Sequence, residues 1–285
     1  MKLLSYGLEH RMEPRLAFLL NGQAVDVMRA SLWMKEERGA IDFLNLPSSM
    51  KLALENWEKS FSLLKALETA ALSLDFESLN IFGRPLSMPL ADIAFFAPIP
   101  DPPSLRYFQA SQPDGLASFT FGNTQTLLGH NQILSHAGLS PKAELAAIIA
   151  AKKEDEHCSV AGYCVLNNWF DPSLSENDGL SYGKASSLGP YFVTADELEP
   201  HKLGSGFSLD LQLRVNGQVT GEGRFRDMQL GFEEMITQAK PTRVLAGDVF
   251  CSGSPFGLDK GIAMKSGDKV EIEVQVLGTL STRVE

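Results

Sequence analysis

The spacing of apolar residues indicates a helical amino-terminal part followed by a β-rich remainder. Residues 15–27 hold two apolar runs separated by Asn21-Gly22, a dipeptide typical of a two-residue hairpin turn. Apolar residues that recur every three or four positions predict helices over residues 31–46 and 60–74. Together these elements predict a small α+β unit.

A proline-rich stretch at the end of residues 93–103 separates this unit from the rest, because proline cannot donate to a sheet. We therefore predict an amino-terminal domain over residues 1–92 and a larger, mostly β domain over residues 93–285. Residues 119–129 are polar and rich in turn formers. Alternating or continuous apolar runs predict strands over residues 142–150, 160–168, 208–215, 244–251 and 270–276, and a helix over residues 232–239.

The strand at residues 142–150 begins with two charged side chains. Lys142 and Glu144 are two residues apart, so on a strand they lie on the same face. The rest of the run is apolar, which is typical of a strand covered on both sides. The pair is therefore either a local ion pair or part of a polar site.

Composition excludes several classes of protein. The net charge of -10 leaves no basic surface for nucleic acid. Three cysteines without a CxxC motif do not indicate a disulfide framework or a zinc site. The amino terminus, residues 1–15, lacks the apolar core of a signal sequence, and no run of apolar residues reaches the length of a membrane span, about 18 residues. We therefore expect a cytoplasmic protein that binds neither nucleic acid nor membrane.

Short motifs spread over the larger predicted domain form an ordered set. They are residues 104–108, 121–123, 144–145, 160–163, Asn167, Lys184, 187–190, 215–217, 247–248 and 252–253. In order and spacing this set resembles the fumarylacetoacetate hydrolase family. The resemblance implies an α+β, mostly β fold, in which a mixed β-roll (a pseudo-barrel) follows a small amino-terminal domain, usually in a homodimer. It also implies a site that holds a small 1,3-dicarbonyl or 2-oxo acid on Mg²⁺ or Ca²⁺.

The chain departs from the family at the positions that hold the metal. Of the family's four carboxylates only Glu144 remains, and Tyr107, Lys142 and Asn168 stand at the other three positions. Both metals prefer anionic oxygen ligands. Lys142 would repel a cation about as strongly as Glu144 attracts it. We therefore expect no metal cofactor, and our hypothesis is that Lys142 replaces the metal and pairs with Glu144.

The resemblance also suggests catalytic residues. Lys184 matches a family lysine that contacts substrate oxygen, although a surface lysine is the alternative. Asp114 stands where the hydrolase branch of the family has its catalytic histidine. It is either a substitute base or a solvated loop carboxylate. We expect Lys142 and Lys184 to bind the acid while Glu144 or Asp114 moves a proton.

Four further residues are candidates for binding the substrate. Tyr107 either donates to a bound oxyanion or fills the space of the missing metal. Asn168 either holds a substrate oxygen through its amide or completes the end of a strand. Gly253 and Ser254 either offer N–H and hydroxyl groups to a carboxylate or form an ordinary turn.

Three classes of function are compatible with these residues. They are a metal-dependent hydrolase, a metal-free enzyme on the same scaffold and a non-catalytic binding or assembly protein. Loss of the carboxylates disfavours the first. We expect a metal-free enzyme that cleaves, decarboxylates or tautomerises a small oxo acid or dicarbonyl compound. A cleft filled by Tyr107, Phe170 or Phe256 would favour the non-catalytic protein instead.

Overall fold

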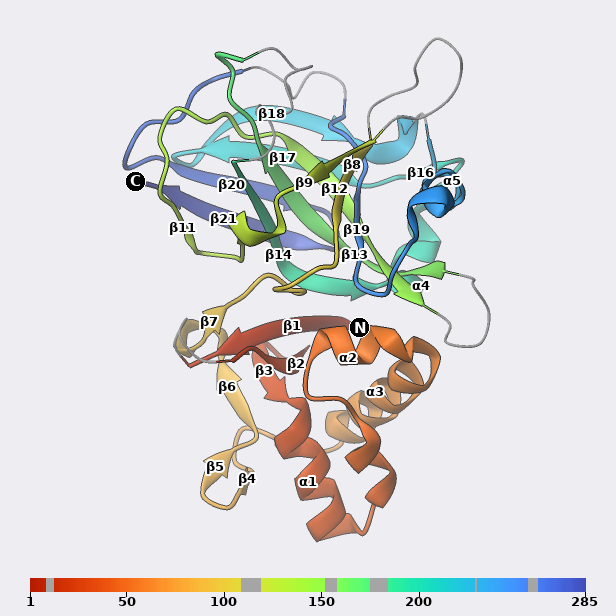
Figure 1. Cartoon of the computed structure of the whole chain (residues 1–285). Helices are drawn as coiled ribbons and strands as arrows, with labels where there is room; N and C mark the ends of the chain where they lie inside the picture. The colour runs from red at the N-terminus through yellow and green to blue at the C-terminus, as the bar shows by residue number, and fades with distance from the viewer. Residues whose placement is uncertain (9–12, 109–118, 152–157, 175–183, 229, 256–260) are drawn as a thin grey trace.

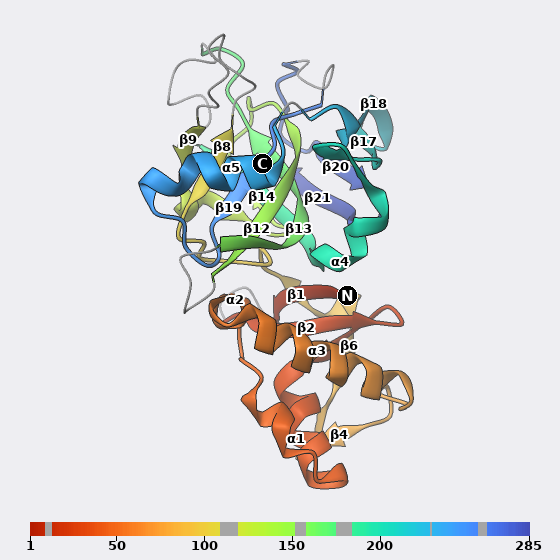
Figure 2. The ribbon, with the colours of Figure 1, turned by 90° about the vertical axis from the view of Figure 1, so that its right-hand side faces the viewer.

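Two lobes, one above the other, make up the protein (Figures 1 and 2). The structure is a computed structural model that describes residues 1–8, 13–108, 119–151, 158–174, 184–228, 230–255 and 261–285. The lower lobe contains the amino-terminal part of the chain. Its elements are β1 (Lys2–Gly7), β2 (Arg15–Leu20), β3 (Gln23–Asp26), α1 (Val27–Arg38), α2 (Met50–Glu55), α3 (Trp57–Leu72), β4 (Asn80–Ile81), β5 (Arg84–Pro85) and β6 (Ser87–Pro89).

The upper lobe is mostly β-structure. Within the described ranges no helix has both the length and the apolar character needed to cross a membrane. The elements after β6 are β7 (Ala94–Phe95), β8 (Leu105–Phe108), β9 (Phe119–Gly122), β10 (Leu127–Leu128), β11 (Ile133–Leu134), β12 (Ala143–Ala151), β13 (Cys158–Trp169), β14 (Ala185–Thr194), α4 (Ala195–Leu198), β15 (Lys202–Leu203), β16 (Gly206–Phe207), β17 (Asp210–Val215), β18 (Gln218–Arg224), α5 (Phe232–Ala239), β19 (Val249–Cys251), β20 (Lys269–Val274) and β21 (Gly278–Val284).

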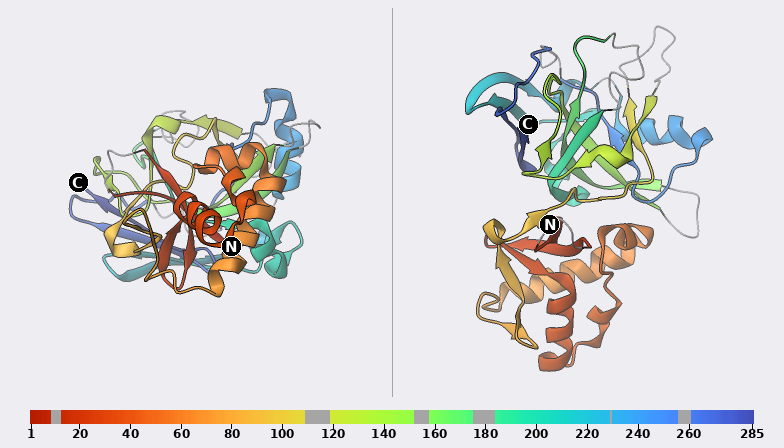
Figure 3. Two further views of the ribbon diagram at one scale, coloured as in Figure 1. Left: turned by 90° about the horizontal axis from the view of Figure 1, so that it is seen from below. Right: turned by 60° about the vertical axis from the view of Figure 1, so that its left-hand side comes forward.

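One 12-stranded sheet passes through both lobes, with its main path in the order β6-β3-β2-β1-β14-β13-β12-β19-β8-β9. The lobes join where β1 pairs antiparallel with β14. A five-stranded sheet, β11-β21-β20-β17-β18, completes the upper lobe (Figure 3). Strands β8 and β19 are parallel, whereas β12 and β13 are antiparallel. The fold is therefore α+β and mostly β, as the resemblance implied.

Local sequence signals explain where most elements begin and end. The hairpin of β2 and β3 turns at Asn21 and Gly22, whose φ angles are 49° and 77°. The helix expected over residues 31–46 was wrongly placed, because α1 begins after Asp26 and ends at Gly39. The Asp26 carboxylate caps it by accepting the Arg29 N–H at 2.7 Å. These end signals outweigh the apolar spacing, and residues 41–45 form a separate 3₁₀ turn.

Two other expectations need correction. The strand expected over residues 244–251 is limited to β19, because the N–H of Leu245 donates to the Asp248 carboxylate at 2.8 Å and closes a turn. Residues 119–122, expected in a polar and turn-rich segment, form β9 and pair with β8. Strands β1 and β14 lacked a clear apolar period, and the sequence pattern alone did not predict them.

Apolar packing also crosses between the lobes. Met50 and Leu54 of α2 belong to the same buried cluster as Ala146 and Ile148 of β12. The ring centroids of Trp57 in α3 and Phe192 in β14 lie 5.4 Å apart, edge to face. The division at residues 92 and 93 stays a prediction, and both the sheet and this cluster extend across it.

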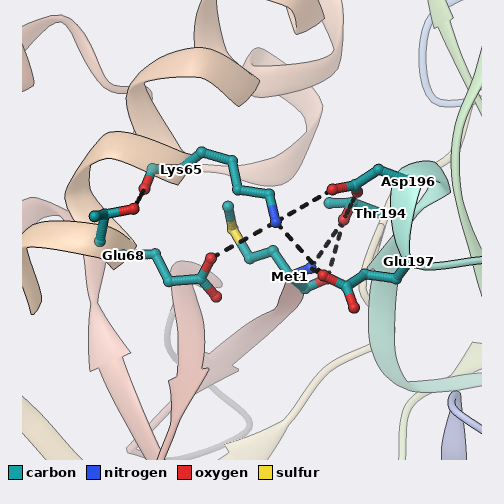
Figure 4. Close-up of polar contacts among 7 residues, drawn as sticks. Met1, Lys65, Glu68, Thr194, Asp196 and Glu197 are labelled. Atoms are coloured by element: carbon teal, nitrogen blue, oxygen red, sulfur yellow. Dashed lines mark hydrogen bonds and ion pairs between the residues drawn. The ribbon is translucent and has the colours of Figure 1, made fainter. Parts of the chain in front are cut away.

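A polar cluster joins α3 to the end of β14 (Figure 4). Lys65 of α3 lies 3.2 Å from Asp196 and 3.4 Å from Glu197, both in α4. The Met1 ammonium lies 2.5 Å from the Glu197 carboxylate, and its hydrogen bond keeps the pKa of Glu197 below its usual value. Burial lowers the pKa of Lys65, but hydrogen bonding and the neighbouring carboxylates outweigh this effect and raise it.

Replacing Lys65 with methionine should weaken this junction. We expect the free energy of unfolding at pH 7 to fall by about 1 kcal/mol, the upper end for partly exposed ion pairs. Because the pKa of Glu197 is lowered in the folded state, its contribution is present above the usual glutamate pKa and lost as the pH falls through the lowered value. The difference between the two proteins should therefore shrink below about pH 4.

Urea unfolding between pH 3 and pH 8 measures this difference. Lys59→Met is the matched control, because Lys59 is exposed on the same helix. Equal losses from the two substitutions would show that the cluster does not stabilise the junction.

Candidate functional site

The candidate site lies where β12 begins, on one face of the large sheet. Glu144 of β12 is opposite Leu166 of β13, and Asn168 lies two residues further along β13 on the same face. Ser186 of β14 is opposite Asn168. The strand register thus brings Glu144, Asn168 and Ser186 to one end of three neighbouring strands.

The Glu144 carboxylate is buried, with 1% of the residue exposed. Its Oε1 atom accepts a hydrogen bond from Asn168 Nδ2 at 3.1 Å, and its Oε2 atom accepts one from the Gly253 N–H at 3.1 Å. Buried carboxylates need such donors, because an unpaired charge in the interior is costly. Three residues named from the sequence, Glu144, Asn168 and Gly253, therefore lie in direct contact.

Backbone geometry aims the Gly253 N–H at Glu144. Ser252 extends the pairing of β19 with β12, because its N–H donates to the Leu145 carbonyl at 2.9 Å and its hydroxyl accepts the Leu145 N–H at 3.0 Å. Gly253 follows with a φ of 74°, which favours glycine. Ser252 belongs to one of the family-like motifs, but the sequence gives no sign that it anchors this loop.

Asn168 has a second polar atom with a different environment. The residue is 1% exposed, and its Oδ1 atom is buried without a hydrogen-bond partner among the described residues. The backbone of Asn168 is tied down, because its N–H donates to the Lys142 carbonyl at 2.9 Å. The amide therefore has one end on Glu144 and a bare acceptor at the other.

Tyr107 extends across the same face from β8. Its register partner on β19 is Cys251, which in turn lies opposite Ala146 of β12. The Tyr107 and Ser186 hydroxyls are hydrogen-bonded to each other, so the side chain reaches β14 on the far side of β12 and β13. Burial, with smaller effects from Cys251 and Glu144, raises the pKa of the Tyr107 phenol well above its usual value.

Gly122 makes room for the Tyr107 ring. A Cβ atom at Gly122 would lie 2.4 Å from the Tyr107 Cε2 atom, closer than real side chains approach. Tyr107 is 5% exposed, so its ring fills space at this end of the sheet. Both roles considered for Tyr107, filling the space of a missing metal and donating to a substrate oxyanion, stay predictions.

Two further residues named from the sequence flank this cluster along the chain. Lys142 precedes β12, and its N–H donates to Asn167 Oδ1 at 2.9 Å. The hydrogen bonds described for the Glu144 side chain come from Asn168 and Gly253, so a pair with Lys142 stays a prediction. Ser254 follows Gly253, and its hydroxyl lies 3.5 Å from the Pro255 carbonyl.

Lys184 precedes β14 at the same end of the sheet. Its side chain is 41% exposed and its ammonium lies 2.5 Å from the Asp171 carboxylate. The Lys184 hydrogen bond lowers the pKa of Asp171 to about 2. Lys184 thus faces solvent and an acidic partner in this conformation, and its contact with substrate stays a prediction. Asp114 and Phe256 lie outside the described residues.

A buried ion pair supports the site from the opposite face of β8. The Arg106 guanidinium lies 2.9 Å from the Asp248 carboxylate, and both residues are at most 2% exposed. Arg106 also donates to the Thr242 hydroxyl and the Arg243 carbonyl. These bonds hold the loop before β19, and through it the strand that leads to Gly253.

The match to a family model covers most of this architecture. The model for the fumarylacetoacetate (FAA) hydrolase C-terminal domain matches residues 105–285, so the chain belongs to the fumarylacetoacetate hydrolase family. The oxaloacetate tautomerase YisK of Bacillus subtilis (strain 168) is 31% identical over 180 residues. That alignment covers 56% of this chain and 58% of the relative, so the chain spans less than two thirds of its length.

Solved structures share the fold over the whole chain. Maleylpyruvate hydrolase from Sphingobium sp. SYK-6, in complex with manganese(II) ion and pyruvate, has a TM-score of 0.70 at 21% identity and covers 100% of this chain and 98% of its own. A 2-keto-3-deoxy-D-arabinonate dehydratase, complexed with magnesium and 2,5-dioxopentanoate, has a TM-score of 0.65 at 21% identity over 100% and 99% of the two chains. Identities this low show a common fold.

The described residues do not fit a divalent cation of this kind. Glu144 is the one carboxylate at the four positions that the resemblance assigns to metal ligands, and both of its oxygens already accept N–H bonds. Burial keeps the Tyr107 phenol protonated at neutral pH. Across the described ranges, no three His, Cys, Asp or Glu side chains are grouped as a metal site requires.

The fit between Gly122 and Tyr107 can be tested by a double-mutant cycle. We expect Gly122→Ala to destabilise the protein by about 1–3 kcal/mol, because the new methyl group overlaps the Tyr107 ring. In a Tyr107→Leu background the same change should cost less than about 0.5 kcal/mol. Urea unfolding of the four proteins gives both values. Equal costs in the two backgrounds would show that the ring does not occupy this space.

Proposed function

We propose that the protein is an enzyme that tautomerises a small 2-oxo acid or 1,3-dicarbonyl acid without a divalent metal. The cluster of Glu144, Asn168 and Gly253, within the residues that the family model matches, is the observation that carries this proposal. The aligned relative named as an oxaloacetate tautomerase supports the substrate class. Hydrolysis and decarboxylation of the same acids are the other reactions within this class.

The chemistry needs one proton carrier and several hydrogen-bonding groups. Glu144 takes a proton from the carbon beside the ketone, and the C–H electrons form a C=C bond while the C=O π electrons move onto the carbonyl oxygen. Glu144 then gives its proton to that oxygen. The Gly253 N–H and the Asn168 amide hold the Glu144 carboxylate in place. Lys142 and Lys184, which precede β12 and β14 at this end of the sheet, bind the carboxylate of the acid. No step requires a metal-bound water.

Metal independence can be tested directly. We expect purified protein treated with excess EDTA to keep its full rate of oxaloacetate tautomerisation, followed by enol absorbance, and added Mg²⁺ or Mn²⁺ to give no increase. Glu144→Gln should reduce the rate by about 100-fold or more, because it removes the proton carrier. Acylpyruvates, assayed in the same way, test for carbon–carbon cleavage.

Two lysine variants complete the experiment. Lys184→Ala should raise the KM, whereas Lys202→Ala, an exposed lysine on β15, should leave the kinetics unchanged. Activity that disappears with EDTA and returns with Mg²⁺ or Mn²⁺ would contradict the metal-free proposal. A rate of tautomerisation in Glu144→Gln equal to that of the wild type would contradict the role of Glu144.

A non-catalytic binding protein is the second candidate. It is favoured by the burial of Tyr107 and Phe170, which are 5% and 8% exposed at this end of the sheet. Such a protein would turn over none of these acids, yet one of them would raise its melting temperature. In either case a cytoplasmic homodimer remains our expectation from the sequence and the family resemblance.

A further inference from the structure

The Asn168 Oδ1 atom is a buried acceptor without a donor among the described residues. Buried polar atoms in native proteins nearly always have a partner, which can be protein, water or ligand. This one lies on the residue that contacts Glu144, in the cluster to which we assign the function. The missing donor is therefore informative about what the site binds.

Glu144 determines which atom of the Asn168 amide has no hydrogen-bond partner among the described residues. A carboxylate only accepts hydrogen bonds, so the amide must turn its Nδ2 atom toward Glu144 and its Oδ1 atom away. The Gly253 N–H holds the other carboxylate oxygen at 3.1 Å, which prevents the carboxylate from rotating freely. The Asn168 backbone is fixed between β12 and β14. The site thus presents a neutral acceptor in a defined orientation.

We propose that Asn168 is a specificity-determining residue whose Oδ1 atom accepts a hydrogen bond from a hydroxyl group of the ligand. This inference rests on the proposed function and names the form of the acid that the site prefers. The enol of an oxo acid carries such a hydroxyl, whereas its keto form offers only an acceptor. Two acceptors facing each other in a buried site repel and leave both without a donor.

The preferred ligand is therefore an enolic or 2-hydroxy acid, and the site selects it over the corresponding ketone. An aspartate at this position would carry a negative charge and could bind a cation. The amide oxygen of Asn168 is neutral and can accept a hydrogen bond from a hydroxyl group. The Tyr107 hydroxyl is hydrogen-bonded to Ser186 on β14, the strand next to that of Asn168. The Oδ1 atom is covered in this conformation, so the ligand must displace a neighbouring group to reach it.

The test compares two acids that differ in the group on the carbon next to the carboxylate. Lactate carries a hydroxyl where pyruvate carries a ketone. We expect the wild-type protein, titrated in EDTA and followed by NMR, to bind lactate about tenfold or more tightly than pyruvate. In Asn168→Leu, which lacks the acceptor, the two dissociation constants should differ by less than about twofold, because no hydrogen bond then separates the ligands.

Glu144→Gln is a second variant, and it should reverse the order of the two affinities. The glutamine Nε2 atom can donate to Asn168 Oδ1 while its Oε1 atom still accepts the Gly253 N–H. The Asn168 amide then turns its Nδ2 atom toward the ligand and prefers an acceptor. We expect this variant, of nearly unchanged shape, to reverse the order and bind pyruvate more tightly than lactate. Circular dichroism and melting temperature confirm that each variant is folded.

Each outcome has a definite meaning. Equal affinities of the wild type for both acids, or an order unchanged in both variants, would overturn the inference and leave a buried water as the partner of Oδ1. If the wild type also tautomerises oxaloacetate, the proposed function survives that result. Binding of neither acid, with no turnover, would overturn both proposals.

Discussion

The placement of one carboxylate inside a sheet constrains the whole candidate site. Glu144 is buried at the start of β12, where its charge is tolerated only because N–H groups surround it. Those donors come from different parts of the chain, β13 and the loop after β19. The side chain of Asn168 and the φ angle of Gly253 are therefore both consequences of the need to solvate Glu144 internally.

The large sheet is what brings these donors together. Strand β14 pairs with β13 on one side and β1 on the other, so the lobes share a backbone ladder as well as apolar packing. The buried pair of Arg106 and Asp248 holds the loop that leads into β19. A pair buried this deeply is costly to break, because either partner alone would be an unpaired charge. The site therefore rests on a rigid frame.

Among the four positions that the resemblance assigns to metal ligands, this chain has a single carboxylate, Glu144. A phenol, an amide and a thiol surround the single carboxylate, and burial raises the pKa of both Tyr107 and Cys251. The family fold is thus present together with a hydrogen-bonded cluster around one buried carboxylate. Neutral groups discriminate between ligands by their pattern of donors and acceptors. Such groups can distinguish an enol, which has an O–H donor, from a ketone, which has only an acceptor.

The sequence by itself determined the family, the β-rich class, the Asn21-Gly22 turn and the absence of carboxylates at Tyr107 and Asn168, because these depend on local conformation or on residue identity. It did not reveal β14, the contact of Tyr107 with Ser186 or the bare oxygen of Asn168. Such features depend on strand register and on which groups meet across a sheet. Residues far apart in the chain acquire these partners only when it folds, so tertiary structure alone decided them.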